Sequence, residues 1–150
     1  MPLIDPDKAF TRIGTGYPAE LIKPCATRIV KALGDAGGLT QFGAHLVTLP
    51  PGCWASQRHA HSHEDEFCYI LTGHPTLIDD DGETPLKPGD AMTHKAGDGN
   101  AHHLINKTDK DVTFLAVGSR RPDVDSTIYP DVDLAVKPGR IFARKDGSPV

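Results

Sequence analysis

The densest set of chemically reactive side chains lies between Arg58 and Glu66, where three of the eight histidines fall close together. His59 and His61 are separated by one residue. In a β-strand, side chains two residues apart share a face and lie about 6.6 Å apart, given a rise of about 3.3 Å per residue. Both imidazoles can therefore face one metal ion, and Glu66, which opens the next β-prone run, can supply a negatively charged ligand.

A further histidine ligand is predicted at His102 or His103, which precede a short apolar run. Alternation along a strand turns only one of these side chains inward, and periodicity does not choose between them. Two or three imidazoles with one carboxylate suit divalent iron, manganese, nickel or zinc, and iron and manganese usually keep positions open for water or substrate. The residues therefore predict one divalent transition metal of unspecified identity.

Short β-strands are the elements that must position these ligands. Runs rich in Val, Ile, Leu, Phe, Thr and Tyr alternate with clusters of Gly, Pro, Asp and Asn about every ten residues, which is typical of an all-β sandwich or barrel. Strands are expected over residues 27–33, 40–49, 54–61, 66–72, 76–79, 83–86, 91–94, 101–106, 112–118 and 140–143.

Turns and chain ends complete this prediction. Residues 79–82 and 106–109 are each expected to close a hairpin, because Gly tolerates positive φ and Asp and Asn bond their own backbone. The N-terminal segment through Pro24 and the C-terminal segment from Pro122 contain several prolines and show little alternation. We interpret them as extended arms that lie over the barrel or on a partner subunit, and we expect a homodimer.

The composition excludes several classes of protein. A chain of 150 residues is sufficient for one domain with one core. Its 16 basic and 20 acidic residues are scattered, so we expect no nucleic-acid partner. The longest apolar run, residues 67–71, is far too short to span a membrane. Acidic residues near the start occupy positions where a secretory signal would be basic, so we expect a cytoplasmic location. The three cysteines match no disulfide or zinc pattern, so we expect reduced thiols.

The histidine segment also resembles a known family. Gly52, His59, His61, Glu66 and Gly73 follow the order of the first signature of the cupins, with the gap between the glycine and the first histidine one residue longer than usual.

The second cupin signature resembles the segment from Pro88 to Asn106, in which a histidine precedes the asparagine by four positions. This resemblance selects His102 over His103. Lys95 stands where proline is usual, and the loop before His102 is longer than the common form.

The resemblance implies a double-stranded β-helix barrel of the cupin or jelly-roll type, with extended N- and C-terminal arms. It implies a single domain over residues 1–150, with a barrel core at about 27–118 and a C-terminal arm at about 122–150. It also implies a metal ion and often a dimer. Outside the signatures, residues 33–35, 38–43, 129–134 and 145–149 resemble small bacterial single-domain cupins that lack an agreed activity. The implied metal ligands are His59, His61, Glu66 and His102.

Three further residues are predicted to contact the substrate. Gln57 has the strand parity of His59, Cys68 has that of Glu66, and His94 could line the pocket. No residue is identified as the general base.

The remaining polar candidates have weaker predicted roles. His63 and His103 are expected at the surface or beside the ligands. The candidate anion partners are Arg58, Arg120 and Arg121, and their positions relative to the pocket are not predicted.

These observations favour a metal-dependent cupin enzyme acting on a small oxygen-rich metabolite, with dioxygenase, isomerase and lyase chemistry all open. Two alternatives remain. One is a sugar-phosphate isomerase, and the other is a non-catalytic cupin that binds or senses a small molecule.

Overall fold

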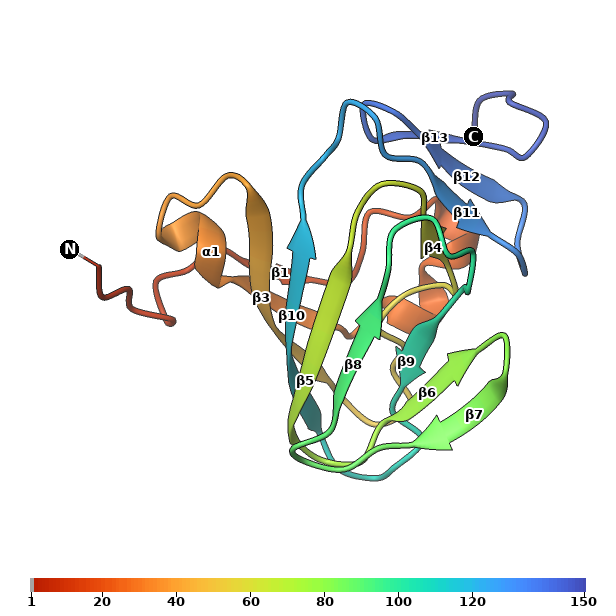
Figure 1. Ribbon diagram of the computed structural model, residues 1–150. Coiled ribbons are helices and arrows are strands. Elements are labelled where there is room, and N and C mark those ends of the chain that lie inside the picture. Colours follow the sequence, from red (N-terminus) through yellow and green to blue (C-terminus); the bar gives the residue numbers. More distant parts are fainter. Residues whose placement is uncertain (1) are drawn as a thin grey trace.

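Three antiparallel β-sheets surround one interior in the computed structural model, which describes residues 2–150 (Figure 1). The largest sheet has six strands in the order β1-β2-β3-β10-β5-β8. Their bounds in this order are Thr11–Ile13, Ile29–Ala32, Phe42–Leu49, Val112–Ser119, Glu66–Thr72 and Ala91–His94.

Two smaller sheets pack against this one. The first has the order β7 (Gly82–Pro85), β6 (Thr76–Asp79) and β9 (His103–Ile105). The second has the order β13 (Ile141–Ala143), β12 (Leu134–Lys137), β11 (Thr127–Tyr129) and β4 (Ala60–His61). The described residues form three short helical segments, η1 (Ala19–Leu21), η2 (Lys23–Cys25) and α1 (Leu33–Ala36). None of these helices has the length and apolar character needed to cross a membrane.

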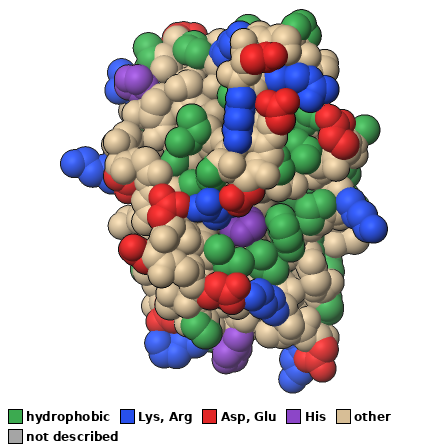
Figure 2. Space-filling model, turned by 90° about the vertical axis from the view of Figure 1, so that its right-hand side faces the viewer, with side chains coloured by type: hydrophobic (Ala, Val, Ile, Leu, Met, Phe, Trp, Pro, Cys, Tyr) green, Lys and Arg blue, Asp and Glu red, His purple; other side chains and the backbone are tan. Residues whose placement is uncertain are grey.

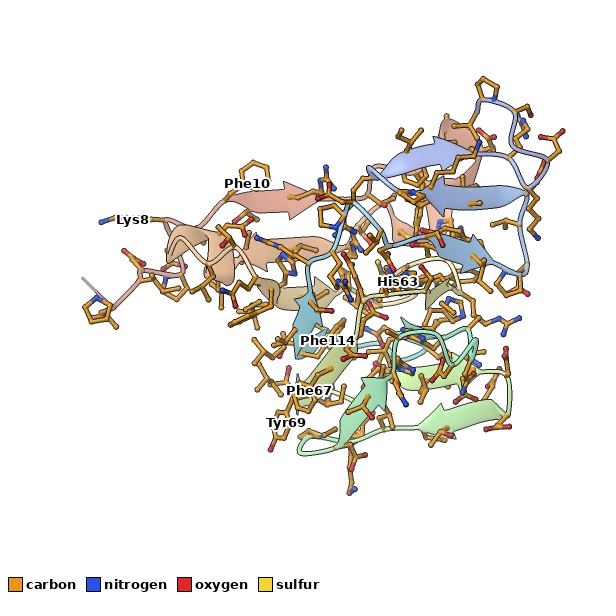
Figure 3. The ribbon with its side chains drawn as sticks, turned by 45° about the horizontal axis from the view of Figure 1, so that its top comes forward. Lys8, Phe10, His63, Phe67, Tyr69 and Phe114 are labelled. Carbon is orange, nitrogen blue, oxygen red and sulfur yellow. The ribbon has the colours of Figure 1, made fainter. Side chains whose placement is uncertain are left out.

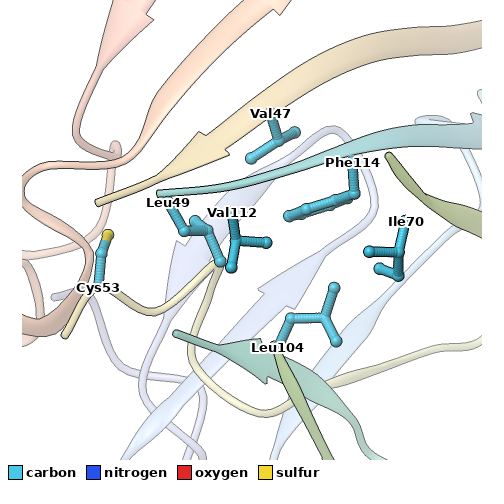
Figure 4. Close-up of a cluster of buried hydrophobic side chains, with 7 residues drawn as sticks. All are labelled: Val47, Leu49, Cys53, Ile70, Leu104, Val112 and Phe114. Carbon is cyan, nitrogen blue, oxygen red and sulfur yellow. The ribbon is translucent and has the colours of Figure 1, made fainter. Parts of the chain in front are cut away.

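The main hydrophobic core lies between the six-stranded sheet and β9 (Figure 4). Leu49 of β3 is paired with Val112 of β10, and Val47 is paired with Phe114, so alternation along both strands turns these side chains to the same side. Full burial of such a side chain contributes about 1.5–3 kcal/mol. The complete cluster is Val47, Leu49, Cys53, Ile70, Leu104, Val112 and Phe114.

Strand β5 separates the interior from an apolar outer surface. Ile70 is fully buried, whereas Phe67, Tyr69 and Leu71 point outward and are 37–43% exposed. Figure 3 shows Phe67 and Tyr69 on the outer side of the sheet. Glu66 has the same parity as Ile70, and alternation therefore turns this carboxylate toward the interior.

Gly73 ends β5 at a position that requires glycine. Its φ is +80°, and a Cβ there would lie 2.8 Å from both the carbonyl oxygen of Asp111 and Cγ2 of Val112. A side chain at this position would therefore clash with the neighbouring strand as well as strain the backbone.

The all-β prediction is confirmed, and most expected strands lie within two residues of the observed ones. The expected strand at 54–61 is reduced to β4 and two isolated bridges, at Trp54 and His59. The 79–82 turn closes the β6–β7 hairpin as expected.

One predicted hairpin is wrong. Residues 106–109 join β9 to β10, but β9 pairs with β6 while β10 pairs with β3 and β5. The turn instead carries the chain from one sheet to another, and Asn106 holds it by donating hydrogen bonds to the carbonyls of Leu49 and Lys110.

The C-terminal segment, expected as an extended arm with one strand at 140–143, contains three strands. These are β11, β12 and β13, and β11 pairs with β4 beside the predicted metal ligands. On the face shown in Figure 2, acidic and basic side chains are intermixed rather than gathered into a basic stripe.

Candidate metal centre

Backbone pairing brings the two histidine segments together. His59 and His102 form an isolated antiparallel bridge and exchange two backbone hydrogen bonds, of 3.1 and 2.8 Å. Their ring centroids lie 5.0 Å apart. Because directly opposed residues of an antiparallel pair project to the same side, His102 faces His59.

The carboxylate of Glu66 lies among three imidazoles. Its Oε1 is 3.8 Å from Nε2 of His59 and 3.7 Å from Nε2 of His61, and its Oε2 is 2.7 Å from Nε2 of His102. The ligand atoms of His59, His61 and Glu66 all lie within 4.8 Å of one another. His102 is outside this compact group but contacts the same carboxylate.

The other nitrogen of each imidazole faces an oxygen acceptor. Nδ1 of His59 is 2.9 Å from the carbonyl of Gln57, and Nδ1 of His61 is 2.7 Å from Oδ2 of Asp125. Nδ1 of His102 is 3.4 Å from the carbonyl of Asn100. With each proton on Nδ1, the Nε2 lone pairs point toward Glu66, which is the arrangement that a metal ion requires of histidine ligands.

The charge of Glu66 also suits a cation. Burial raises the pKa of its carboxyl, but the adjacent His102 and His59 rings outweigh burial and hold the pKa well below its usual range. Within residues 2–150, its buried Oε2 has no partner in hydrogen-bonding geometry. The 2.7 Å approach of this oxygen to Nε2 of His102 requires either a proton on that nitrogen or a cation between the two atoms, and three imidazoles with one carboxylate are a donor set that fits a divalent metal.

A cavity of about 240 Å³ opens beside these ligands. Its wall is largely apolar, and a second hollow of about 200 Å³ shares Glu66, Cys68 and Ala116 with it. The residues that line the first cavity include Tyr17, Arg28, Ser56, Cys68 and His103. The size suits a small metabolite rather than a drug-sized ligand.

The structure separates the three predicted substrate residues. Cys68 lines both cavities, and burial raises the pKa of its thiol to about 12, so it remains protonated near neutrality. His94 stacks on His102 with ring centroids 3.2 Å apart, and burial lowers its pKa to about 4. Gln57 is buried and its amide donates to the carbonyl of Leu21 at 3.1 Å. Gln57 and His94 are not among the described residues that line either cavity.

Several functional candidates were missed by the sequence analysis. Asp125 holds His61 from the C-terminal segment, and nothing in its local sequence marks it. His103 is buried and lines the cavity together with His59, Glu66 and His102, so of its two expected positions the one beside the candidate ligands is observed. Its Nδ1 lies 2.9 Å from the carbonyl of Ser56, and burial lowers its pKa.

The structure also shows where the arginines lie relative to the cavities. Arg28, which was not singled out, lines the first cavity. Arg120 lines the second hollow and is paired with Asp35. Arg58 is paired with Asp131 and Asp80 and is not among the described residues that line either cavity.

Known proteins share this architecture. The cupin domain family matches residues 45–118. A crystal structure of a sugar phosphate isomerase of the cupin superfamily from Silicibacter pomeroyi DSS-3 is 44% identical, with a TM-score of 0.92, over 99% of this chain and 96% of that chain. A proposed sugar phosphate isomerase from Acidithiobacillus ferrooxidans is 30% identical, with a TM-score of 0.73, over 79% of this chain and 75% of that chain.

A predicted oxalate decarboxylase from Thermotoga maritima is 23% identical, with a TM-score of 0.61, over 79% of this chain and 99% of that chain. At this identity the likeness concerns the fold alone. No match is found among curated proteins.

Proposed function

The chain belongs to the cupin superfamily, and on that premise we propose that it is a metal-dependent isomerase of sugar phosphates. The observation that carries this proposal is the likeness to the Silicibacter pomeroyi protein, which extends over nearly all of both chains. The Acidithiobacillus ferrooxidans protein is likewise a proposed sugar phosphate isomerase. These likenesses favour isomerisation over the oxygen-dependent and lyase chemistries that the sequence left open.

We propose that His59, His61, Glu66 and His102 hold the metal, which is a divalent first-row ion. A bound ion of this kind polarises a sugar carbonyl and stabilises negative charge on neighbouring oxygens. Asp125 keeps the proton of His61 on Nδ1, and His94 limits the movement of His102 by stacking on its ring. The mostly apolar wall excludes water from the substrate.

Conversion of an aldose phosphate into a ketose phosphate moves a proton from the carbon beside the carbonyl to the carbonyl carbon, and the hydroxyl proton on that neighbouring carbon passes to the carbonyl oxygen. We propose His103 as the group that carries the proton between the two carbons. Its ring lines the cavity, and its Nδ1 proton is committed to the carbonyl of Ser56. Nε2 is therefore the nitrogen left to accept a proton and return it.

Turnover is the direct test of this function. The metal content of the purified protein is measured first, and aldose and ketose phosphates of five and six carbons are then supplied. We expect interconversion that stops after chelation and returns when metal is added. His61→Ala should lose both metal and activity, whereas His74→Ala, at an exposed position, should keep both. A metal-loaded protein that binds these substrates without converting them would instead support a non-catalytic binding function.

We also propose that two copies of the chain form a homodimer. The outer side of the six-stranded sheet exposes Phe67, Tyr69 and Leu71. The edge strand β1 follows Phe10 and ends at Ile13, and both of these side chains are 72% exposed. Apolar side chains gathered on a sheet face or edge are typical of an interface.

A further inference from the structure

Arg28 brings a positive charge to the wall of the cavity, and no acidic side chain within residues 2–150 pairs with it. Its side chain is half-buried, Nη1 donates to the carbonyl of Ala55 at 2.6 Å, and Nε donates to the carbonyl of Gly14 at 3.3 Å. Both acceptors are neutral. Arg28 therefore differs from the paired Arg58, Arg120 and Arg140, whose partners are carboxylates.

Several N–H donors of the Arg28 guanidinium remain available to bind a ligand. A guanidinium has five N–H donors, and the two contacts use one donor on Nε and one on Nη1. Within the described part of the chain, Nη2 makes no hydrogen bond. A charge removed from water is costly unless an opposite charge compensates it, and an anionic ligand in this cavity would do so. Burial lowers the pKa of Arg28, which agrees with this cost.

Two hydroxyl groups line the same cavity. The hydroxyl oxygen of Tyr17 accepts the backbone N–H of Gln57 at 3.3 Å, so its own proton is available to a ligand. Ser56 supplies the second hydroxyl, with Oγ 3.3 Å from Nδ1 of His59. A cation and O–H donors in one largely apolar cavity match the needs of a phosphoryl group, which offers several strong acceptor oxygens.

We propose that Arg28 binds the phosphoryl group of the substrate through its free N–H groups, with the Tyr17 hydroxyl as a second donor. The identity of the ligand as a sugar phosphate rests on the proposed function. Three of the proposed metal ligands, His59, Glu66 and His102, line the same cavity as Arg28, so the sugar oxygens and the phosphoryl group are held by separate parts of its wall. A phosphoryl group held at Arg28 fixes which end of the sugar reaches the metal ligands and His103.

Binding of inorganic phosphate tests this directly. The full-length protein is titrated with phosphate by calorimetry at constant ionic strength, as purified and after metal removal. We expect phosphate to bind in both states, and Arg28→Gln to weaken binding about 10- to 100-fold, which is typical for loss of a charge-assisted contact. Arg28→Lys should also weaken binding, because an ammonium cannot reproduce the planar set of donors. Tyr17→Phe should cause a smaller loss.

Arg12→Gln is the matched control. Arg12 is an exposed residue of β1 that is close enough to influence the pKa of Arg28, so this variant removes a nearby positive charge outside the cavity. Phosphate affinity should change little. Equal losses of phosphate affinity in the Arg12 and Arg28 variants would mean that phosphate responds only to the overall positive charge near the cavity, and the proposal would fail.

Other results would also overturn the assignment. Phosphate binding that disappears with the metal and is unaffected by Arg28→Lys would place the anion at the metal centre. Acetate that binds more tightly than phosphate would indicate a carboxylate site. If Arg28→Gln does not fold, Arg28→Lys and Tyr17→Phe decide the outcome, since unchanged affinity in both contradicts the proposal.

Turnover separates this inference from the proposed function. Phosphate binding that depends on Arg28, in a protein that converts no sugar phosphate, would retain the anion site and reject the isomerase. Isomerase activity with an unchanged KM in the Arg28 variants would support the isomerase and reject the anion site at Arg28. If the isomerase function and the anion site are both correct, Arg28→Lys should raise KM for the sugar phosphate far more than it lowers kcat.

Discussion

The acceptor of each histidine Nδ1 determines which nitrogen faces Glu66. For His61 this acceptor is Asp125, a buried carboxylate 2.7 Å away that also accepts the backbone N–H of His63. A carboxylate in this position fixes the orientation of the ring and makes it a stronger ligand.

Replacement of Asp125 should therefore weaken metal binding without removing a ligand. We expect Asp125→Asn to lower metal affinity about 10- to 100-fold, because the amide no longer carries the charge that strengthens His61. Competition with a chelator of known affinity measures the change. Asp123→Asn, at an exposed position of the same segment, is the control and should bind metal as the wild type does. Equal affinity in the Asp125 variant would show that the contact has no influence on the metal.

His103 should affect turnover and leave the metal in place. His103→Gln keeps a side-chain donor for the carbonyl of Ser56 but cannot take up a proton. We expect kcat for sugar phosphate isomerisation to fall about 100-fold or more, the usual effect of losing a general base. Elemental analysis should find unchanged metal content, and the exposed His74→Gln should behave as wild type. A normal kcat in the His103 variant would assign proton transfer to another group.

At the scale of elements, Arg58 joins segments that are distant in the sequence. Its Nε and Nη2 form a two-point ion pair with Asp131 in the turn between β11 and β12, at 2.8 and 2.9 Å. Its Nη1 contacts Asp80 in the turn between β6 and β7. The residue directly before His59 therefore connects the two smaller sheets.

This ion pair should stabilise the fold in a pH-dependent way. The hydrogen bond from Arg58 lowers the pKa of Asp131, so the pair contributes stability above the unfolded value of about 3.9 and loses it as pH falls through the lower folded value. Because Asp131 is largely exposed, we expect Asp131→Asn to cost only about 1 kcal/mol at pH 7.

Denaturant unfolding at several pH values measures this difference. The gap between wild type and Asp131→Asn should close toward pH 3, and Asp109→Asn, at an exposed site, should show no gap. A gap that is constant with pH would mean that the variant acts through packing rather than charge.

At the scale of the whole molecule, the outer face of the six-stranded sheet is an exposed apolar surface. Leu115 of β10 is paired with Tyr69 of β5 and with Leu46 of β3, and Val117 is paired with Phe67. These cross-strand rows form an apolar surface continuous over three strands, which is typical of a subunit interface.

We therefore expect light scattering at micromolar concentration to give twice the chain mass of 16.1 kDa. Phe67→Ser combined with Tyr69→Ser should shift the protein toward monomer, because it removes two large apolar side chains from the centre of the surface. Ile128→Ser, on an exposed position of β11, should remain dimeric. A monomeric wild type would reject the homodimer.

The sequence by itself determined what depends on local spacing. Alternation of apolar residues marked most of the strands, and the spacing of His59, His61 and Glu66 marked a set of ligands that the structure brings together. These features depend on the two-residue period of a strand and on short turns, so they can be read from a few consecutive residues.

Only the tertiary structure decided the partners that come from distant segments. The pairing of His59 with His102, the contact of Asp125 with His61 and the place of Arg28 in the cavity each join residues far apart in the chain. The strands of the C-terminal segment are similarly stabilised by pairing with each other and with β4, and their own sequence shows little alternation. Such contacts arise from the packing of whole sheets, and no local pattern encodes which segments will meet.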